Sequence, residues 1–123
     1  MLVCSNAAEE IEFCQRAFGA VELSRRTSKD GSVIHATLEI NESLIMIHDE
    51  SPHLASCAPQ ADGSSSVVNF LYGDEVDSII ERAVAEGARI LLPAEDQSWG
   101  DRVGRIVDPS GHVWNIAARI QEE

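Results

Sequence analysis

Hydrophobic and polar residues follow two different spacings along the 123-residue chain. In two segments, apolar residues recur every three or four positions, which is the spacing of an amphipathic helix. The first segment opens at Asn6, with Glu9 three positions later, and closes at Gly19, as capping residues would require. The second opens at Asp74 and closes at Gly87. We therefore predict one helix between residues 6 and 19 and another between residues 74 and 87.

Short apolar or alternating runs around these segments predict β-strands. Turn residues such as Asp30-Gly31, Asn41-Glu42 and Pro109-Ser110-Gly111 separate several of the runs. The expected strands cover residues 2–4, 21–25, 33–40, 44–48, 67–72, 89–92, 103–107 and 113–117.

The two halves of the chain repeat each other. Asn6 and Asp74, Ile11 and Ile79, and Gly19 and Gly87 are each separated by 68 positions. A constant offset across cap, apolar face and helix end indicates an internal duplication. The prediction is one α+β domain over residues 1–123, made of two tandem βαβββ modules. The first module covers about 1–49, the second about 67–123, and a polar linker covers 50–66.

Alternation along the strands separates two faces of each predicted sheet. In the run 33–40, Ile34, Ala36, Leu38 and Ile40 would pack on a helix, and the intervening residues would face away. Trp114 is expected in the core under a helix rather than as a platform for a ligand. The other face could line a small-molecule pocket or could simply meet solvent. Its members with polar or adaptable side chains are His35, Thr37, Met46, His48 and Asn115.

Charge and composition restrict the classes of molecule that the chain could bind. Nine basic and 21 acidic side chains give a net charge of −12, which disfavours nucleic acid and anionic membranes and favours cationic over anionic ligands. No apolar run reaches the length of a membrane span. Residues 1–6 lead straight into a helix start, which argues against a secretory signal. Cys4, Cys14 and Cys57 are too widely spaced for a disulfide framework, so we expect a cytoplasmic protein whose cysteines are small buried hydrophobes.

Three phrases of the sequence resemble a known family. They are the first helix with its end at residues 8–20, the run EDQSWGDR at 95–102 and the run DPSGHVW at 108–114. Together they are similar to the PhnB-like branch of the vicinal oxygen chelate superfamily, which contains glyoxalases, bleomycin-resistance proteins and ring-cleaving dioxygenases. The resemblance implies that curved mixed sheets enclose a cleft, and that the chain forms a homodimer.

The same resemblance gives expectations about metal. Metal-dependent members carry ligands on the first and last strand of each module, and the matching positions here are Met46, Asn115 and Val67 or Val68. These side chains do not replace His and carboxylate around a divalent ion, so we expect no metal cofactor there. His48, Asp49, His53 and Cys57 lie close in sequence, but their spacing matches no known metal motif.

Two loop features leave their roles open. Trp99 could stack on a planar ligand and Arg102 could grip an anionic group at the rim of a cleft, or both could belong to a structural turn. His112, in the DPSGH turn, is expected to be a capping or surface residue.

The resulting prediction of function is a small-molecule-binding cleft without the usual metal site, lined by His35, Thr37, Met46, His48, Trp99, Arg102 and Asn115. Three alternatives remain: an antibiotic-sequestering protein, a lyase or dioxygenase whose metal is held partly by His35 and His48, and a structural or regulatory dimer without a ligand.

Overall fold

The computed structural model describes the whole chain except residues 52, 54, 61–63 and 121–123. It contains two helices and eight strands in the order βαβββ–βαβββ, as the sequence predicts. The first module holds β1 (Leu2–Cys4), α1 (Ala7–Phe18), β2 (Val21–Thr27), β3 (Val33–Ile40) and β4 (Ser43–Asp49). The second holds β5 (Val68–Tyr72), α2 (Val76–Ala85), β6 (Arg89–Asp96), β7 (Asp101–Val107) and β8 (Val113–Arg119).

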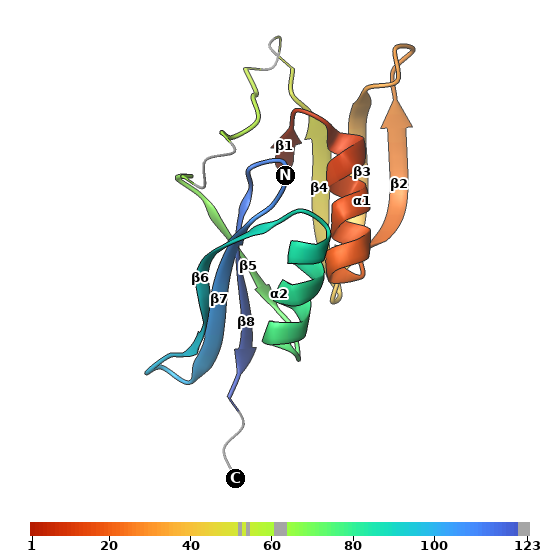
Figure 1. Ribbon diagram of the computed structural model, residues 1–123. Coiled ribbons are helices and arrows are strands. Elements are labelled where there is room, and N and C mark those ends of the chain that lie inside the picture. The colour runs from red at the N-terminus through yellow and green to blue at the C-terminus, as the bar shows by residue number, and fades with distance from the viewer. Residues whose placement is uncertain (52, 54, 61–63, 121–123) are drawn as a thin grey trace.

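Each module folds into its own four-stranded mixed sheet. The strand orders are β1-β4-β3-β2 and β5-β8-β7-β6, and in both sheets the first strand of the module pairs in parallel with the last. Leu2 lies opposite Ile47 in one sheet and Leu71 lies opposite Ile116 in the other, so both partners are displaced by 69 positions between the modules. The two sheets lie side by side without closing into a barrel (Figure 1).

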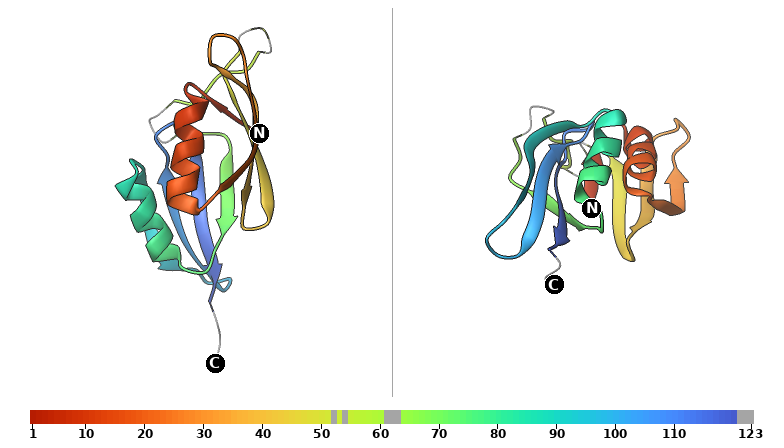
Figure 2. Two further views of the ribbon diagram at one scale, coloured as in Figure 1. Left: turned by 90° about the vertical axis from the view of Figure 1, so that its right-hand side faces the viewer. Right: turned by 60° about the horizontal axis from the view of Figure 1, so that its bottom comes forward.

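Both helices cover the same side of the strands, as Figure 2 shows, and they pack against each other. Buried residues of the two modules form one continuous cluster between helices and sheets. Trp114 on β8 is 1% exposed, and its ring lies 4.9 Å from the ring of Phe18 at the end of α1. The predicted core position of Trp114 is therefore confirmed, and this residue joins the core of one module to the helix of the other.

The two helices begin differently. Asn6 caps α1 by accepting a hydrogen bond from the Glu9 amide at 3.2 Å, and Gly19 ends it in the left-handed conformation. The predicted match of Asp74 to Asn6 is wrong, because Glu75 occupies the capping position of α2 and makes no side-chain capping bond. Three residues separate β5 from α2, whereas two separate β1 from α1, and this extra residue shifts the start of the second helix.

A bulge in β3 changes which side chains face α1. Arg26 pairs with His35 and Thr27 pairs with Val33, so Ile34 is an extra residue in the ladder. Val33 is 3% exposed and Ile34 is 53% exposed, so the expectation that Ile34 packs on the helix is wrong. Ala36, Leu38 and Ile40, beyond the bulge, are buried as predicted.

Within the described residues, no helix is long and apolar enough to cross a membrane. Cys4 and Cys14 are buried as expected, but Cys57, which follows the end of the first sheet, is exposed.

Candidate functional site

The side of each sheet that faces away from the helices is called its outer face here. On the outer face of the first sheet, β3 presents His35 and Thr37, and β4 presents Met46 and His48. Thr37 lies directly opposite Met46 in the ladder. Their neighbours Ala36, Leu38 and Ile47 are fully buried on the helix side. Four of the seven predicted site residues thus lie together on one surface.

Two histidines on this face have defined hydrogen bonds. The His35 ring contacts the Thr37 hydroxyl, with Nε2 and Oγ1 3.2 Å apart. Nδ1 of His48 lies 2.6 Å from the Asp49 carbonyl oxygen. Because a carbonyl can only accept, Nδ1 of His48 carries a proton and donates it to this bond. Nε2 is therefore the ring nitrogen available to a ligand on the outer face.

Asn115 lies on the other sheet and is satisfied within it. It is 8% exposed, and its Oδ1 accepts a hydrogen bond from Arg105 Nε at 2.7 Å. Phe70, directly opposite Asn115 in the β5–β8 ladder, shares its outer face. The rings of Phe70 and Tyr72 are stacked, with centroids 5.5 Å apart, and they are 51% and 48% exposed. The outer face of the second sheet thus presents the Phe70–Tyr72 ring pair beside the Arg105–Asn115 hydrogen bond.

A hollow of about 530 Å³ lies where the two sheets meet, and we call it the strand-edge hollow. Leu44 and Met46 of β4 line it from one side, and Phe70 and Tyr72 of β5 line it from the other. Met46 is thus the predicted site residue that meets the second sheet in this hollow.

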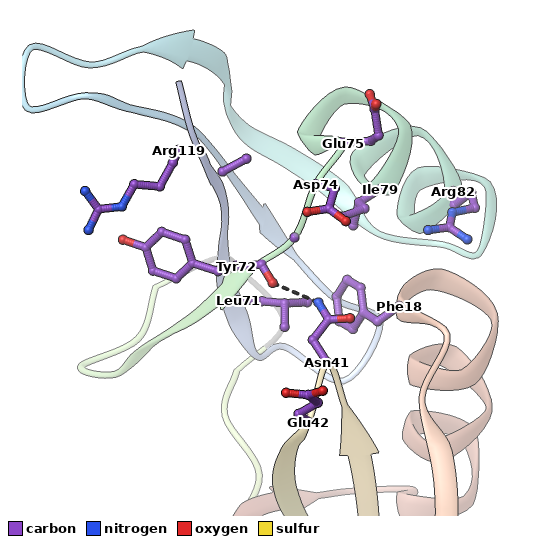
Figure 3. A pocket seen from close by; sticks show the side chains of 12 residues that line it. Phe18, Asn41, Glu42, Leu71, Tyr72, Asp74, Glu75, Ile79, Arg82 and Arg119 are labelled. Atoms are coloured by element: carbon purple, nitrogen blue, oxygen red, sulfur yellow. Dashed lines mark hydrogen bonds between the residues drawn. The ribbon is translucent and has the colours of Figure 1, made fainter. Parts of the chain in front are cut away.

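A larger hollow of about 1220 Å³ adjoins the first and is shown in Figure 3. The two share Asn41, Leu71 and Tyr72 in their linings. The Asn41 side-chain amide donates a 2.8 Å hydrogen bond to the Tyr72 carbonyl oxygen, so it ties the β3–β4 turn of one module to β5 of the other. The charged side chains of this hollow are Glu42, Asp74, Glu75, Arg82 and Arg119.

Tyr72 is fixed by a buried carboxylate. Its hydroxyl donates to Asp101 Oδ2 at 2.8 Å, and Asp101 is 4% exposed. This hydrogen bond to Asp101 raises the pKa of Tyr72, because a phenolate beside a carboxylate would lose the bond and meet a like charge. The phenol therefore remains a neutral donor over the physiological pH range.

Trp99 and Arg102 lie at the β6–β7 hairpin. Trp99 is 63% exposed in the turn. Arg102 donates from Nε and Nη2 to the two oxygens of Asp77 at 2.9 and 3.0 Å, and from Nη1 to Asp96 at 3.1 Å. These hydrogen bonds hold the pKa of Asp77 below its usual range. Since Asp77 belongs to α2, the Arg102 guanidinium is turned toward the helix side and is not among the groups of the outer face.

His48, Asp49, His53 and Cys57, whose spacing matches no metal motif, do not gather into a ligand cluster among the described residues. The carboxylate of Asp49 accepts the backbone amides of Ala7 at 2.7 Å and Val33 at 2.6 Å, so it organises the start of α1 and of β3. His53 and Cys57 are exposed. His112, expected to be a capping or surface residue, is half-buried, and its Nε2 lies 2.8 Å from the Val3 carbonyl oxygen of the other module.

Comparison with known proteins agrees with this architecture. Residues 1–116 match the model of the Glyoxalase/Bleomycin resistance protein/Dioxygenase superfamily. The chain belongs to this superfamily. It is 40% identical over 124 aligned positions to the "Uncharacterized protein Mb0911c" of Mycobacterium bovis, covering 98% of this chain and 82% of the relative. It is also 40% identical to the "Uncharacterized protein Rv0887c" of Mycobacterium tuberculosis, covering 98% of this chain and 73% of that relative.

Solved structures of the superfamily share the fold. TioX from Micromonospora sp. ML1 superposes with a TM-score of 0.75 at 27% identity, covering 97% of this chain and 94% of TioX. A PhnB protein from Bacillus cereus superposes with a TM-score of 0.70 at 21% identity, covering 95% of each chain.

The metal positions of this glyoxalase-type chain do not suit a metal. Met46 offers a thioether, and the Asn115 amide oxygen already accepts from Arg105. At the remaining position Val68 offers no donor atom at all. A set with neither imidazole nor carboxylate does not fit a hard or borderline divalent ion.

Phe70, Tyr72 and Asp101 were not predicted as site residues. A signal for the first two was present, because Val68, Phe70 and Tyr72 occupy alternate positions of one short strand and must share a face. Nothing local indicated Asp101, since its importance depends on Tyr72, which is 29 positions away.

Proposed function

We propose that this chain binds a small organic molecule in the strand-edge hollow and along the adjoining outer face of the first sheet. One observation carries the proposal: Met46 from the polar face of one sheet and the Phe70–Tyr72 pair of the other line the same hollow of about 530 Å³. A pocket with apolar walls, an aromatic platform and few polar groups suits a compact, partly planar ligand. His48 and Thr37 would supply the polar contacts farther along the sheet.

The charge of the surroundings favours a neutral or cationic ligand. Three carboxylates and two guanidinium groups line the adjoining larger hollow, and the chain as a whole carries a net charge of −12. Exposed aromatic rings attract cations through their faces. We therefore propose a planar cation or a neutral heterocycle rather than an organic acid, with the chain acting as a PhnB-like member that binds without the usual metal.

A second copy of the chain would complete the site. Six apolar side chains on the two outer faces are each at least a third exposed, and together they form a large exposed apolar surface. They are Val21, Leu44, Met46, Val68, Phe70 and Tyr72. A homodimer that covers them would bury on the order of 1,200 Å² or more of total surface. Sedimentation velocity from 1 to 200 µM, roughly the range over which weak dimers form, should show dimer, and a pure monomer throughout would contradict this part.

The binding proposal is tested with two dyes of opposite charge. Ethidium is planar and cationic, whereas anilinonaphthalene sulfonate is aromatic and anionic. We expect saturable binding of ethidium that weakens about fivefold to thirtyfold in Phe70→Ala, the size of effect that loss of one cation–π contact of about 1–2 kcal/mol produces. Leu92→Ala is the matched control, because Leu92 is 54% exposed and lies outside both hollows.

His48→Leu separates binding from folding. His48 is not part of the buried hydrophobic cluster, so the substitution should weaken ethidium binding and leave the unfolding midpoint unchanged. A large loss of stability with unchanged binding would show that His48 is a structural residue, and equal binding by Phe70→Ala and the wild type would end the proposal.

A further inference from the structure

A cluster of three potential metal ligands lies at the junction of the two modules, on the opposite side of the sheets from the proposed binding face. Cys4 ends β1, Glu10 lies in the first turns of α1, and His112 lies in the turn between β7 and β8. One donor atom from each lies within 4.8 Å of the other two. Cys4 Sγ and His112 Nε2 are 3.7 Å apart. Residues more than 100 positions apart thus converge on one point.

Glu10 is a buried carboxyl group in this cluster. The side chain is 1% exposed, and neither carboxyl oxygen has a hydrogen-bond partner among the described residues. A buried carboxyl group without a partner is costly, whether it is charged or neutral. Burial and the neighbouring carboxylate of Asp108 raise the pKa of Glu10 well above its usual range. A cation that accepts electron pairs from these oxygens would remove the free-energy cost of burying them.

Asp108 is the carboxylate beside Glu10, and its oxygens already accept three other hydrogen bonds. Oδ1 accepts the backbone amides of Ser110 at 3.0 Å and His112 at 2.9 Å, and Oδ2 accepts from Trp114 Nε1 at 2.8 Å. These bonds hold the turn so that the His112 ring points at Cys4. Asp108 therefore positions the imidazole of His112 beside Cys4 and Glu10.

We propose that Cys4, Glu10 and His112 form a binding site for a zinc ion between the two modules. A thiolate, an imidazole and a carboxylate are the three ligand types that zinc combines in proteins. Neighbouring ligand atoms in a tetrahedral zinc site lie roughly 3.3–3.8 Å apart, given bonds of about 2.0–2.3 Å. The Cys4–His112 separation of 3.7 Å is already in that range, and the remaining separations of up to 4.8 Å would have to shorten by up to about 1.5 Å.

The charges balance when the ion enters. The Cys4 thiol, whose pKa is raised by burial, and the Glu10 carboxyl group each lose a proton, and His112 binds as a neutral ring. Zn²⁺, a thiolate and a carboxylate then sum to zero, so a neutral cluster replaces another neutral cluster in the interior. His112 Nε2 exchanges its contact with the Val3 carbonyl for the bond to zinc, and its proton moves to Nδ1.

This site is distinct from the superfamily's metal positions at Met46 and Asn115. Those lie on the outer faces of the sheets, whereas this cluster involves α1 and the β7–β8 turn. An ion bound there would link β1 and α1 of the first module to the β7–β8 turn of the second.

The test uses zinc alone and, as a spectroscopic probe, cobalt alone. Protein stripped with chelator should bind one equivalent of Zn²⁺, release two protons per ion into a weakly buffered solution, and unfold several degrees higher with metal in excess. Co²⁺ should produce a thiolate-to-metal charge-transfer band. That band should vanish in Cys4→Ser and persist in Cys57→Ser, whose thiol is exposed.

Glu10→Gln is the decisive variant, because Gln keeps the size and the neutral charge of the protonated acid and so preserves the fold. It should bind zinc at least about tenfold more weakly and release one proton fewer. Glu12→Gln, an exposed change on the same helix, should bind like the wild type. No saturable zinc binding, a cobalt band that survives Cys4→Ser, or unchanged affinity in Glu10→Gln would each overturn the proposal, and the last result does so even if Cys4→Ser fails to fold.

Discussion

The last strands of the two modules have the same place in the same topology but different surroundings. In β4 the outer-face residue Met46 is 42% exposed, whereas its counterpart in β8, Asn115, is 8% exposed. The first five residues of β8 are all buried, and only Ile47 of β4 is. The second sheet has filled its own outer face with the pairs Arg105–Asn115 and Tyr72–Asp101. The outer face of the second module is thus filled by its own side chains, whereas the outer face of the first module is open to a ligand or partner.

The largest difference between the modules should appear in the core. Trp114 and Ile45 occupy equivalent positions, but Trp114 is 1% exposed and Ile45 is only partly buried. Trp114→Ala should lower the free energy of unfolding by about 3–5 kcal/mol, and Ile45→Ala by about 1–2 kcal/mol, since a partly buried side chain leaves a smaller cavity. Urea unfolding followed by circular dichroism measures both. Equal losses would contradict the asymmetry of the two cores.

The outer faces should differ by a smaller amount. Asn115→Leu removes the acceptor of Arg105 Nε at a buried position, so it should cost about 1–3 kcal/mol. Met46→Leu, the same new side chain at the equivalent open position, should change stability by less than about 0.5 kcal/mol. Thermal unfolding of the two variants, measured under the same conditions, tests this difference in stability. A Met46→Leu that costs as much as Asn115→Leu would contradict this difference between the two faces.

The smallest effect concerns ionisation. Tyr72 is the chain's single tyrosine, so absorbance at alkaline pH reports it alone. Its pKa is raised by the bond to Asp101; the neutral phenol is therefore favoured in the folded state, and this contribution is lost as pH rises through the folded pKa. We expect a midpoint above 10, the unperturbed value, and a shift toward 10 in Asp101→Asn. A normal midpoint in the wild type would show that the Tyr72–Asp101 pair does not persist in solution.

The sequence predicted the architecture well, because helix caps, alternation and the repeat all report local rules. The strand at 33–40 and the helix end at Gly19 follow from such rules, and both are confirmed. Ile34 escaped prediction because a bulge depends on how β3 pairs with β2, not on β3 alone. The capping position of Glu75 was not predicted, because the extra residue between β5 and α2 does not change the 68-residue offset between the apolar faces of the two helices.

The site was harder to predict because it depends on contacts between distant residues. Alternation grouped His35, Thr37, Met46 and His48 on one face, since neighbouring strands in a hairpin impose that grouping. It could not separate Asn115 from them, because the partner that occupies Asn115 is Arg105 on another strand. Arg102 has the same difficulty: its role is decided by Asp77, 25 positions earlier, on α2.

The parallel pairing of the first and last strand in each module also governs how the chain acquires its shape. β1 can join its sheet only after β4 exists, because the residues that lie opposite Leu2–Cys4 are Ile47–Asp49. On the ribosome, α1 and the β2–β3–β4 hairpins would form while Leu2–Cys4 waits unpaired, and the same order would repeat with β5 and β8. Closure of each module is thus a late, non-local event. A chain released before β8 emerges would expose β5 as an unpaired strand with two aromatic side chains, and such strands are prone to aggregate.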